Sequence, residues 1–500
     1  MAIIVLIFPG YSDAADWKVS PTLNLIETYS DNVRLAPPGN EKGDYITQVN
    51  PGITIAGTGP RLQIDARYLM KNLVYAEENS RNSTNHLFNA RANAELVDDY
   101  FYLDAKSSIS QQSISPLAPI TFDNTNIIND RTEVRTYSIS PYFHHNFGRL
   151  VSSKLRYTHN AVDTNAKGLL DSRANNILFQ LKSGPAFNRQ GWELNYSKEN
   201  IDYIKAFTDT ENEKYSLKLS YKILSKFSLT ASGGYEKHTF LSINKNPEGP
   251  FWLAGFSWVP SDRTSIAASA GKRFYGNTYS LMADHRTRRT VWSLGYNEGI
   301  TNTNSQFVLP ATIDTAIFLD QLWSSSIPDP VIRKQIVDDF IIQNGLSASL
   351  ANPVNFLTNR VFLQKLFQAS LAISGAKNTI LFSMLSMLRE SQTSQISDSA
   401  LFGINNMALS DTSKQLSANI LWNWKISARN STNVGIGYIR NSFPAIDRQF
   451  DTKSMNISLI RKFQPTVSGS LGLRHIQRES SDAINEYSEN AITASVQMIF

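Results

Sequence analysis

Basic side chains that alternate with apolar ones are the residues of this sequence best suited to chemistry. Between positions 215 and 223, every second residue is tyrosine, leucine or isoleucine, and Lys218 and Lys222 lie between them. An extended strand directs successive side chains to opposite faces, so such a segment has an apolar face and a charged face. The same pattern predicts a set of inward-facing basic residues, namely Arg67, Lys71, Lys154, Arg156, Lys182, Lys218, Lys222 and Arg474.

Acidic side chains on the same predicted faces are fewer than the basic ones. They are Asp65, Asp104, Glu193 and Glu199. If these faces line a water-filled passage, the basic excess favours anions or acidic sugars. The alternative is a solvated polar wall in which the opposite charges pair with one another.

Residues for catalysis, metals or cofactors do not form a recognisable motif. The sequence has no HExxH, GxSxG, phosphate-binding loop or EF-hand loop, and its seven histidines are scattered. His144 and His145 are adjacent on a predicted strand, so they point to opposite faces and cannot both bind one metal from that strand. With no cysteine there is no disulfide, thiolate site or covalent haem attachment. We expect no enzyme and no cofactor, although a hydrolase with dispersed site residues is an open alternative.

Composition narrows the class of protein. The chain has 500 residues, of which 41% are hydrophobic, and a formal net charge of +5. No apolar run reaches the roughly 18 residues of a membrane-spanning helix. No lysine or arginine run with interleaved aromatic residues appears, so we expect no nucleic-acid partner.

The last strand carries the strongest structural signal. Ile492, Ala494, Val496, Met498 and Phe500 fall on one face, and Thr493, Ser495 and Gln497 on the other. A strand with lipid on one side and water on the other needs this pattern. A terminal Phe after such alternation resembles the signal that barrel-assembly machinery reads, whereas the alternative is the last strand of a soluble β-sandwich.

The remaining segments predict an all-β fold, a single transmembrane antiparallel barrel in the outer membrane of a Gram-negative cell. The alternating segments have the length of roughly 9–11 residues that a tilted strand needs to cross a bilayer. These segments are connected alternately by short turns rich in Gly, Pro, Asn and Asp and by longer polar stretches. This layout predicts short periplasmic turns and long extracellular loops. Three strands at Thr264–Phe274, Thr278–Arg286 and Thr290–Asn302 bring the total to about 22, with every short turn expected at one end.

The N-terminal residues 1–14 are predicted to be the rear part of a signal peptide, and residues 15–500 the barrel. Ala2–Phe8 is apolar, and Ser12 and Ala14 are small residues before a cleavage site. The usual basic start is missing, and a buried first strand is the alternative. A TonB-dependent transporter is not expected, because the first strand begins near Trp17 without a preceding plug domain.

The segment Phe307–Asn359 breaks the alternation and predicts a helical insertion. Apolar residues recur at helical spacing from about Asp329 to Asn344, after Pro328-Asp-Pro330. Thr312–Trp323 is expected to form a second short helix. We expect an extracellular cap or plug, with binding of an outside partner as the alternative.

Three short motifs resemble a family. Tyr29-Ser-Asp-Asn-Val33, the turn Arg286–Arg289 and Gly375-Ala-Lys-Asn-Thr379 are similar to segments of the PEP-CTERM system-associated outer membrane proteins. The resemblance implies a porin-like barrel whose genes accompany exosortase and exopolysaccharide systems. It supplies no catalytic or binding residues.

Three functions follow as expectations. The first is a conduit or assembly component linked to exopolysaccharide export, with outer-membrane lipid, the barrel-assembly machinery and an export system as partners. The second is a general diffusion porin. The third is a structural or adhesive barrel that binds a partner through the insertion.

Overall fold

The computed structural model describes most of the chain from Asp16 to Phe500. The residues outside the description are 1–15, 116, 120–124, 129–130, 167, 170, 205–208, 241, 243–246, 309–314, 325–326, 328–332, 334–336, 338–356, 399–407 and 410. The predicted signal peptide lies outside the described residues.

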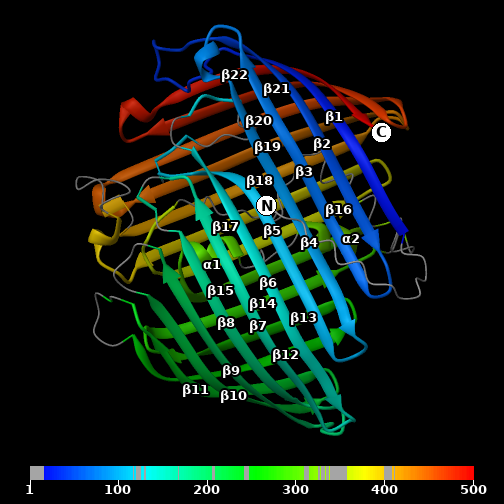
Figure 1. Cartoon of the computed structure of the whole chain (residues 1–500), viewed down its shortest axis with the longest axis vertical. Coiled ribbons are helices and arrows are strands. Elements are labelled where there is room, and N and C mark those ends of the chain that lie inside the picture. The colour runs from blue at the N-terminus through cyan, green and yellow to red at the C-terminus, as the bar shows by residue number, and fades with distance from the viewer. Residues whose placement is uncertain are drawn as a thin grey trace.

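The described chain forms one 22-stranded antiparallel sheet that closes into a barrel (Figure 1). The last strand pairs with the first, for example Val496 with Leu25, so the wall has no free edge. The strands are β1 Asp16–Ser30, β2 Asp44–Thr58, β3 Leu62–Tyr75, β4 Ser83–Val97, β5 Phe101–Ser113, β6 Arg131–Phe147, β7 Val151–Thr164, β8 Ser172–Ser183, β9 Gln190–Tyr203, β10 Thr210–Leu224, β11 Phe227–His238, β12 Glu248–Ser261, β13 Thr264–Arg273, β14 Gly276–Arg286, β15 Thr290–Thr301, β16 Phe362–Ser374, β17 Asn378–Ser391, β18 Thr412–Lys425, β19 Asn430–Phe443, β20 Arg448–Gln464, β21 Val467–Ser480 and β22 Tyr487–Ile499. The predicted fold and strand number are confirmed.

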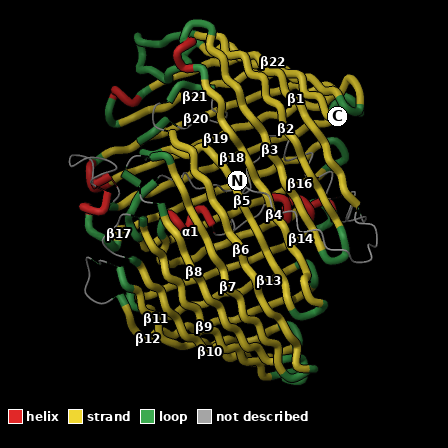
Figure 2. Tube along the Cα trace, viewed as in Figure 1, coloured by secondary structure: helices red, strands yellow, loops and turns green. Residues whose placement is uncertain are grey.

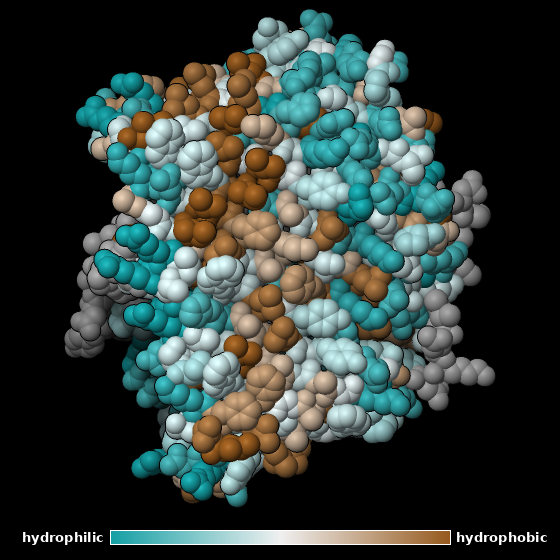
Figure 3. Space-filling view, turned by 180° about the vertical axis from the view of Figure 1, so that it is seen from behind, coloured by the Kyte–Doolittle hydropathy of each residue, from teal (hydrophilic) through white to brown (hydrophobic). Residues whose placement is uncertain are grey.

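The period-two pattern determines which side chains face out of the barrel. On β10, Leu217, Leu219 and Tyr221 are 45%, 52% and 47% exposed, as expected for side chains on the outer surface. On β22, Ile492 and Val496 lie on the same outer face, and Phe500 continues it. Figure 3 shows one side of the molecule, where an apolar band lies between two polar zones. This band matches the lipid-facing belt of an outer-membrane barrel.

Short turns join the strands at one end of the barrel, and most connections at the other end are longer. In outer-membrane barrels the short turns face the periplasm, which assigns this short-turn end to the periplasm and the loop end to the exterior. Two hairpins depart from the prediction, since only residues 444–447 join β19 to β20 at the loop end. Only Phe274 and Tyr275 join β13 to β14 at the same end, so the expectation that every short turn lies at one end is wrong there. Gly276, with φ of +119°, permits the tight reversal.

In the described part of the chain, β15 is followed by α1 Thr303–Val308 and α2 Thr315–Trp323, and Arg333 and Val337 further along are also helical. The loops also contain short 3-10 helices at η1 Asn79–Arg81, η2 Gln395–Asp398, η4 Pro444–Ile446 and η5 Ala483–Asn485. Figure 2 shows helices inside the outline of the barrel. α2 falls within the predicted segment Thr312–Trp323.

Among the described residues, no helix is both long and apolar enough to cross a membrane.

Candidate functional site in the barrel lumen

Helix α2 packs against the inner face of the wall near the short-turn end. Val291 points inward, since it is 1% exposed while its neighbour Trp292 is 49% exposed on the outer surface. The buried cluster that joins helix and wall contains Val291, Ala372 and Leu381 of β15–β17, Phe318, Leu319, Leu322 and Trp323 of α2, and Val337. Ile317, by contrast, is 61% exposed. Helix α2 therefore buries one face against the wall and leaves another open.

The two ends of the insertion lie at the opposite end of the barrel. Phe307 of α1 packs with Val134, Val162 and Leu357, at the loop ends of β6 and β7. The described parts of the insertion therefore lie at both ends of the barrel, with Phe307 and Leu357 at the loop end and α2 near the short turns. The helix predicted from Asp329 to Asn344 lies outside the described residues except for Arg333 and Val337.

Buried hydrogen bonds hold the returning chain. Arg360 is 1% exposed; its Nη1 lies 2.7 Å from Asp411 Oδ1, and its Nη2 donates to the Thr393 carbonyl at 2.6 Å. The hydroxyl of Thr358 donates to Asp398 Oδ2 at 2.7 Å. These contacts tie the end of the insertion to the loop between β17 and β18.

The loop between β5 and β6 also reaches into the mouth, where it meets strands on another part of the wall. Asn126 Nδ2 donates to Glu489 Oε1 at 2.7 Å. The same carboxylate accepts from Ser30 Oγ at 2.6 Å and pairs with Arg474 Nη2 at 2.9 Å. The side chain of Glu489 is fully buried, and Arg474 is largely buried. The network therefore fastens this loop to β1, β21 and β22.

A second carboxylate joins two loops outside the membrane-spanning strands. Glu78 accepts from Arg34 Nη2 and from Lys42 Nζ at 2.7 Å. The hydrogen bond from Arg34 and then that from Lys42 lower the pKa of Glu78 to about 2. Glu78 therefore remains charged in mildly acidic solution and keeps the β1–β2 and β3–β4 loops together.

Some of the predicted basic residues have partners on the wall. Arg156 Nη2 lies 2.7 Å from Asp104 Oδ2, and its guanidinium carbon lies 4.1 Å from the centre of the Tyr142 ring. Lys154 approaches the same ring, with Nζ 4.7 Å from the centre. Arg474 belongs to the Glu489 network. For these residues the charge is balanced or covered locally.

Lys182, Lys218 and Lys222 form a different group. Lys182 on β8 and Lys218 on β10 both lie opposite Glu193 of β9 in the strand register. All three lysines are exposed, and none forms an ion pair with the residues that the structure describes. The carboxylate of Glu193 instead accepts from the side chains of Gln180 and Asn195. Their charges therefore face water in the lumen.

Arg67 and Lys71 lie on the inward face of β3. In the register Arg67 is opposite Thr54 and Asn89, and Lys71 is opposite Asn85. Arg67 is exposed, whereas Lys71 is half-buried. The structure does not bring these two residues together with the lysines of β8 and β10.

Beyond these lysines the wall carries small polar residues. A row across β10–β14 runs through Ser220, Thr230, Gly255, Ser269 and Ser280 in consecutive register pairs. Ser269 and Ser280 join their hydroxyls at 2.7 Å. Small side chains here leave room for water beside the lysines.

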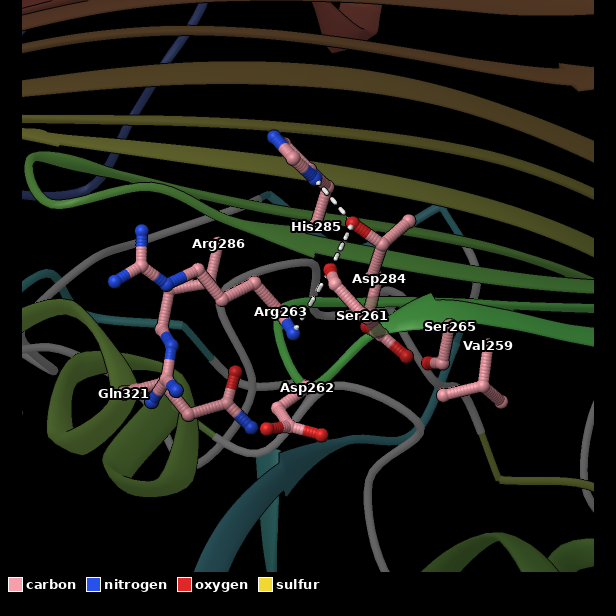
Figure 4. Close-up of a pocket in the computed structure, with 10 residues that line it drawn as sticks. Val259, Ser261, Asp262, Arg263, Ser265, Asp284, His285, Arg286 and Gln321 are labelled. Atoms are coloured by element: carbon pink, nitrogen blue, oxygen red, sulfur yellow. Dashed lines mark hydrogen bonds between the residues drawn. The ribbon is translucent and has the colours of Figure 1, made fainter. Parts of the chain in front are cut away.

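A polar pocket of about 260 Å³ lies where the turn ends of β12–β14 meet α2. Its lining includes Arg263, Arg286, Asp262, Asp284 and Gln321 (Figure 4). Arg286 Nη1 donates to Ser324 Oγ at 3.0 Å, which ties the wall to the end of α2.

Several buried charges escaped the prediction. The Arg273 guanidinium pairs with the fully buried Glu236, and Arg478 Nη2 donates to the Leu117 carbonyl at 3.0 Å. Arg389 is also buried. Arg478 has the same strand parity as Arg474, so alternation could have identified it. Its loop partner could not be found in that way.

Within the described part of the chain, no group of three or more His, Cys, Asp or Glu residues is placed to hold a metal.

No family model matches the chain, and no curated protein matches it. Similar solved structures include the siderophore receptor PirA from Pseudomonas aeruginosa, with 10% identity, a TM-score of 0.44 and coverage of 97% of this chain and 80% of that one. The FrpB iron transporter from Neisseria meningitidis gives 9% identity, a TM-score of 0.49 and coverage of 97% and 82%. The ferric-catecholate import receptor Fiu from E. coli gives 7% identity, a TM-score of 0.45 and coverage of 96% of this chain and 81% of that one. By its own closed wall and apolar belt, this chain is a 22-stranded barrel of the Gram-negative outer membrane.

Proposed function

We propose that this barrel is a conduit for anionic solutes or an acidic polymer, held narrow by its insertion. The observation that carries the proposal is the path of the insertion, which enters at the loop end and packs α2 against the wall near the short turns. A barrel of this strand number encloses a lumen wide enough to need filling. A segment fastened at Arg360 and Arg286 would limit leakage until it moves.

The uncovered lysines support the choice of anions. Lys182, Lys218 and Lys222 keep their charge exposed beside a wall of small hydroxyl-bearing residues. The three lysines outnumber Glu193, which lies opposite two of them, and a local excess of one sign in a low-dielectric passage concentrates ions of the opposite sign. An acidic exopolysaccharide suits this passage, because its hydroxyls can bond to the serine and threonine side chains.

Two alternative functions make predictions that differ from those of the conduit. A general diffusion porin would conduct steadily without any release of the insertion. An adhesive barrel would present the apolar residues of its insertion outside, but Phe318, Leu319 and Leu322 are buried within the lumen. This burial favours the conduit among the three functions.

The test is conductance of the purified protein in planar bilayers. We expect rare openings from the natural sequence and frequent, larger openings from the Leu319→Ser/Leu322→Ser variant, whose helix loses its contacts with the wall. The matched control is Ile317→Ser on the exposed face of the same helix, which should behave like the natural protein.

A cross-link guards against a merely misfolded variant. Cysteines in place of Arg286 and Ser324, whose side chains are in contact, can be joined by a short bis-maleimide reagent, since the chain has no other cysteine. Cross-linking in the Leu319→Ser/Leu322→Ser background should restore low conductance. Equal, steady conductance in the natural protein and all variants would favour the porin and refute the proposal.

A further inference from the structure

The polar pocket at the short-turn end is lined by more charged and hydrogen-bonding side chains than the packing of a helix against a turn requires. Arg263 lies on the β12–β13 turn, and its guanidinium has no hydrogen-bond or ion-pair partner among the described residues. Arg286, on the adjacent strand, makes a single side-chain hydrogen bond, to Ser324. The two strands are joined there by the hydrogen bond from Arg286 N to the Arg263 carbonyl at 2.8 Å. Two guanidinium groups therefore lie near one small space with donors to spare.

The rest of the lining suits hydroxyl groups. Asp262 and Asp284 provide carboxylates that accept hydrogen bonds, and Gln321 of α2 both donates and accepts. Figure 4 shows Gln321 and Asp262 facing the same space. A simple inorganic anion would gain nothing from nearby carboxylates, since like charges repel. A ligand with one acidic group and several hydroxyls would use both halves of the lining.

We propose that this pocket is a subsite for one carboxylated sugar unit of the polymer at the periplasmic mouth. This inference rests on the proposed function and names the class of its substrate. The cavity of about 260 Å³ lies below the range of roughly 300–1,000 Å³ typical of pockets for drug-sized ligands, so it suits a single ring. The sugar carboxylate would bind Arg263 and Arg286, and the sugar hydroxyls would donate to Asp262 and Asp284.

The position of the pocket connects it with the insertion. Gln321 belongs to the exposed face of α2, and Arg286 donates to Ser324 just beyond the helix. A carboxylate in the pocket can use the donors that Arg286 leaves free beside its bond to Ser324. Occupancy of the subsite therefore places the ligand directly beside one attachment of α2 to the wall.

The experiment is isothermal titration of the full-length protein in detergent with trigalacturonate. Maltotriose serves as the neutral sugar and inorganic phosphate as the simple anion. We expect binding of trigalacturonate, and affinity at least tenfold lower in Arg263→Gln and in Arg286→Gln, because each loses charge-assisted hydrogen bonds. The matched control is Arg429→Gln, an arginine on another short turn that does not line the pocket.

Specific outcomes overturn the subsite. Equal affinity in the natural protein, both arginine variants and the control would do so, as would equally tight binding of maltotriose or of phosphate alone. Each variant must retain the heat-modifiable mobility of the natural protein. The conduit is tested independently, because ion selectivity is measured without any sugar. Anion selectivity without trigalacturonate binding would refute only the subsite. Trigalacturonate binding without anion selectivity would refute the conduit.

Discussion

At the scale of single residues, Glu489 has the most consequential position in the lumen. Its buried carboxylate holds Arg474, Ser30 and Asn126 at once. Replacement by Gln leaves the Arg474 charge buried without its counter-charge. Loss of one member of a buried ion pair costs roughly 3–5 kcal/mol. We expect Glu489→Gln to lower the free energy of unfolding by about this amount in urea titrations of protein in vesicles.

The matched control is Glu479→Gln on the neighbouring strand β21. Glu479 pairs with Lys453, and both side chains are 51% exposed. Exposed ion pairs contribute little, so this variant should unfold like the natural protein. Equal behaviour of the Glu489 and Glu479 variants would contradict the importance of burial.

Glu78 predicts a pH dependence at the loop end. Its pKa of about 2 lies below the ordinary carboxyl value near 4.3, so its contacts stabilise the loops fully above that value. The stabilisation is lost as the pH falls from there through about 2. We expect the β1–β2 loop to resist proteolysis by pepsin at pH 4 and to be cut faster at pH 2. In Glu78→Gln the loop should be equally sensitive at both pH values after correction for the activity of pepsin on an unfolded substrate.

Strand alternation allows the side of the wall to be predicted for such residues, but not their partners. The inward position of Arg474 follows from its parity with Ser470 and Gly472. Arg474 pairs with Glu489 of the neighbouring strand, but the loop residue that shares this carboxylate, Asn126, is distant in the sequence. Local patterns contain no information on which loop folds into the mouth.

At the scale of elements, β22 closes the barrel. Its outer face continues to Phe500, whose backbone N–H donates to the Pro21 carbonyl at 2.9 Å. An outward charge must enter lipid, at a cost of about 2–4 kcal/mol for Arg at mid-membrane and less near the interface. We expect Val496→Arg, and deletion of Phe500, to reduce the amount of folded barrel in outer membranes. Gln497→Arg, on the inner face, should assemble normally; similar yields of all three would contradict the role predicted for this strand.

The insertion illustrates what periodicity cannot predict. An apolar stripe predicts a helix that must bury one face, and α2 does so. The stripe does not identify the surface that covers it. Here that surface includes Val291, Ala372 and Leu381, which point inward from β15–β17. The sequences of these segments predict membrane strands and do not identify the helix that they contact. The depth of α2 in the lumen therefore required the three-dimensional structure.

At the scale of the whole molecule, the closed wall was the most predictable feature. Closure and alternation are imposed by the bilayer, which tolerates no unpaired edge and no polar outer belt. The arrangement of charge inside the lumen is less constrained. Arg156 and Arg474 acquire carboxylate partners, while Lys182, Lys218 and Lys222 do not among the described residues.

The difference between paired arginines and exposed lysines predicts which residues determine the ion selectivity of the lumen. The three exposed lysines should attract anions, and their effect should weaken at high salt because the screening length falls from about 10 Å at 0.1 M to about 3 Å at 1 M. In the Leu319→Ser/Leu322→Ser background, which should conduct, we expect anion-selective reversal potentials across a KCl gradient. Replacement of Lys182, Lys218 and Lys222 by Gln should move the reversal potential towards zero, and replacement by Glu should change its sign. The control is Lys237→Gln on β11, whose side chain lies on the opposite face from the inward Glu236. A cation preference in the starting background, or a shift in the control as large as in the triple variant, would refute an anion-selective lumen.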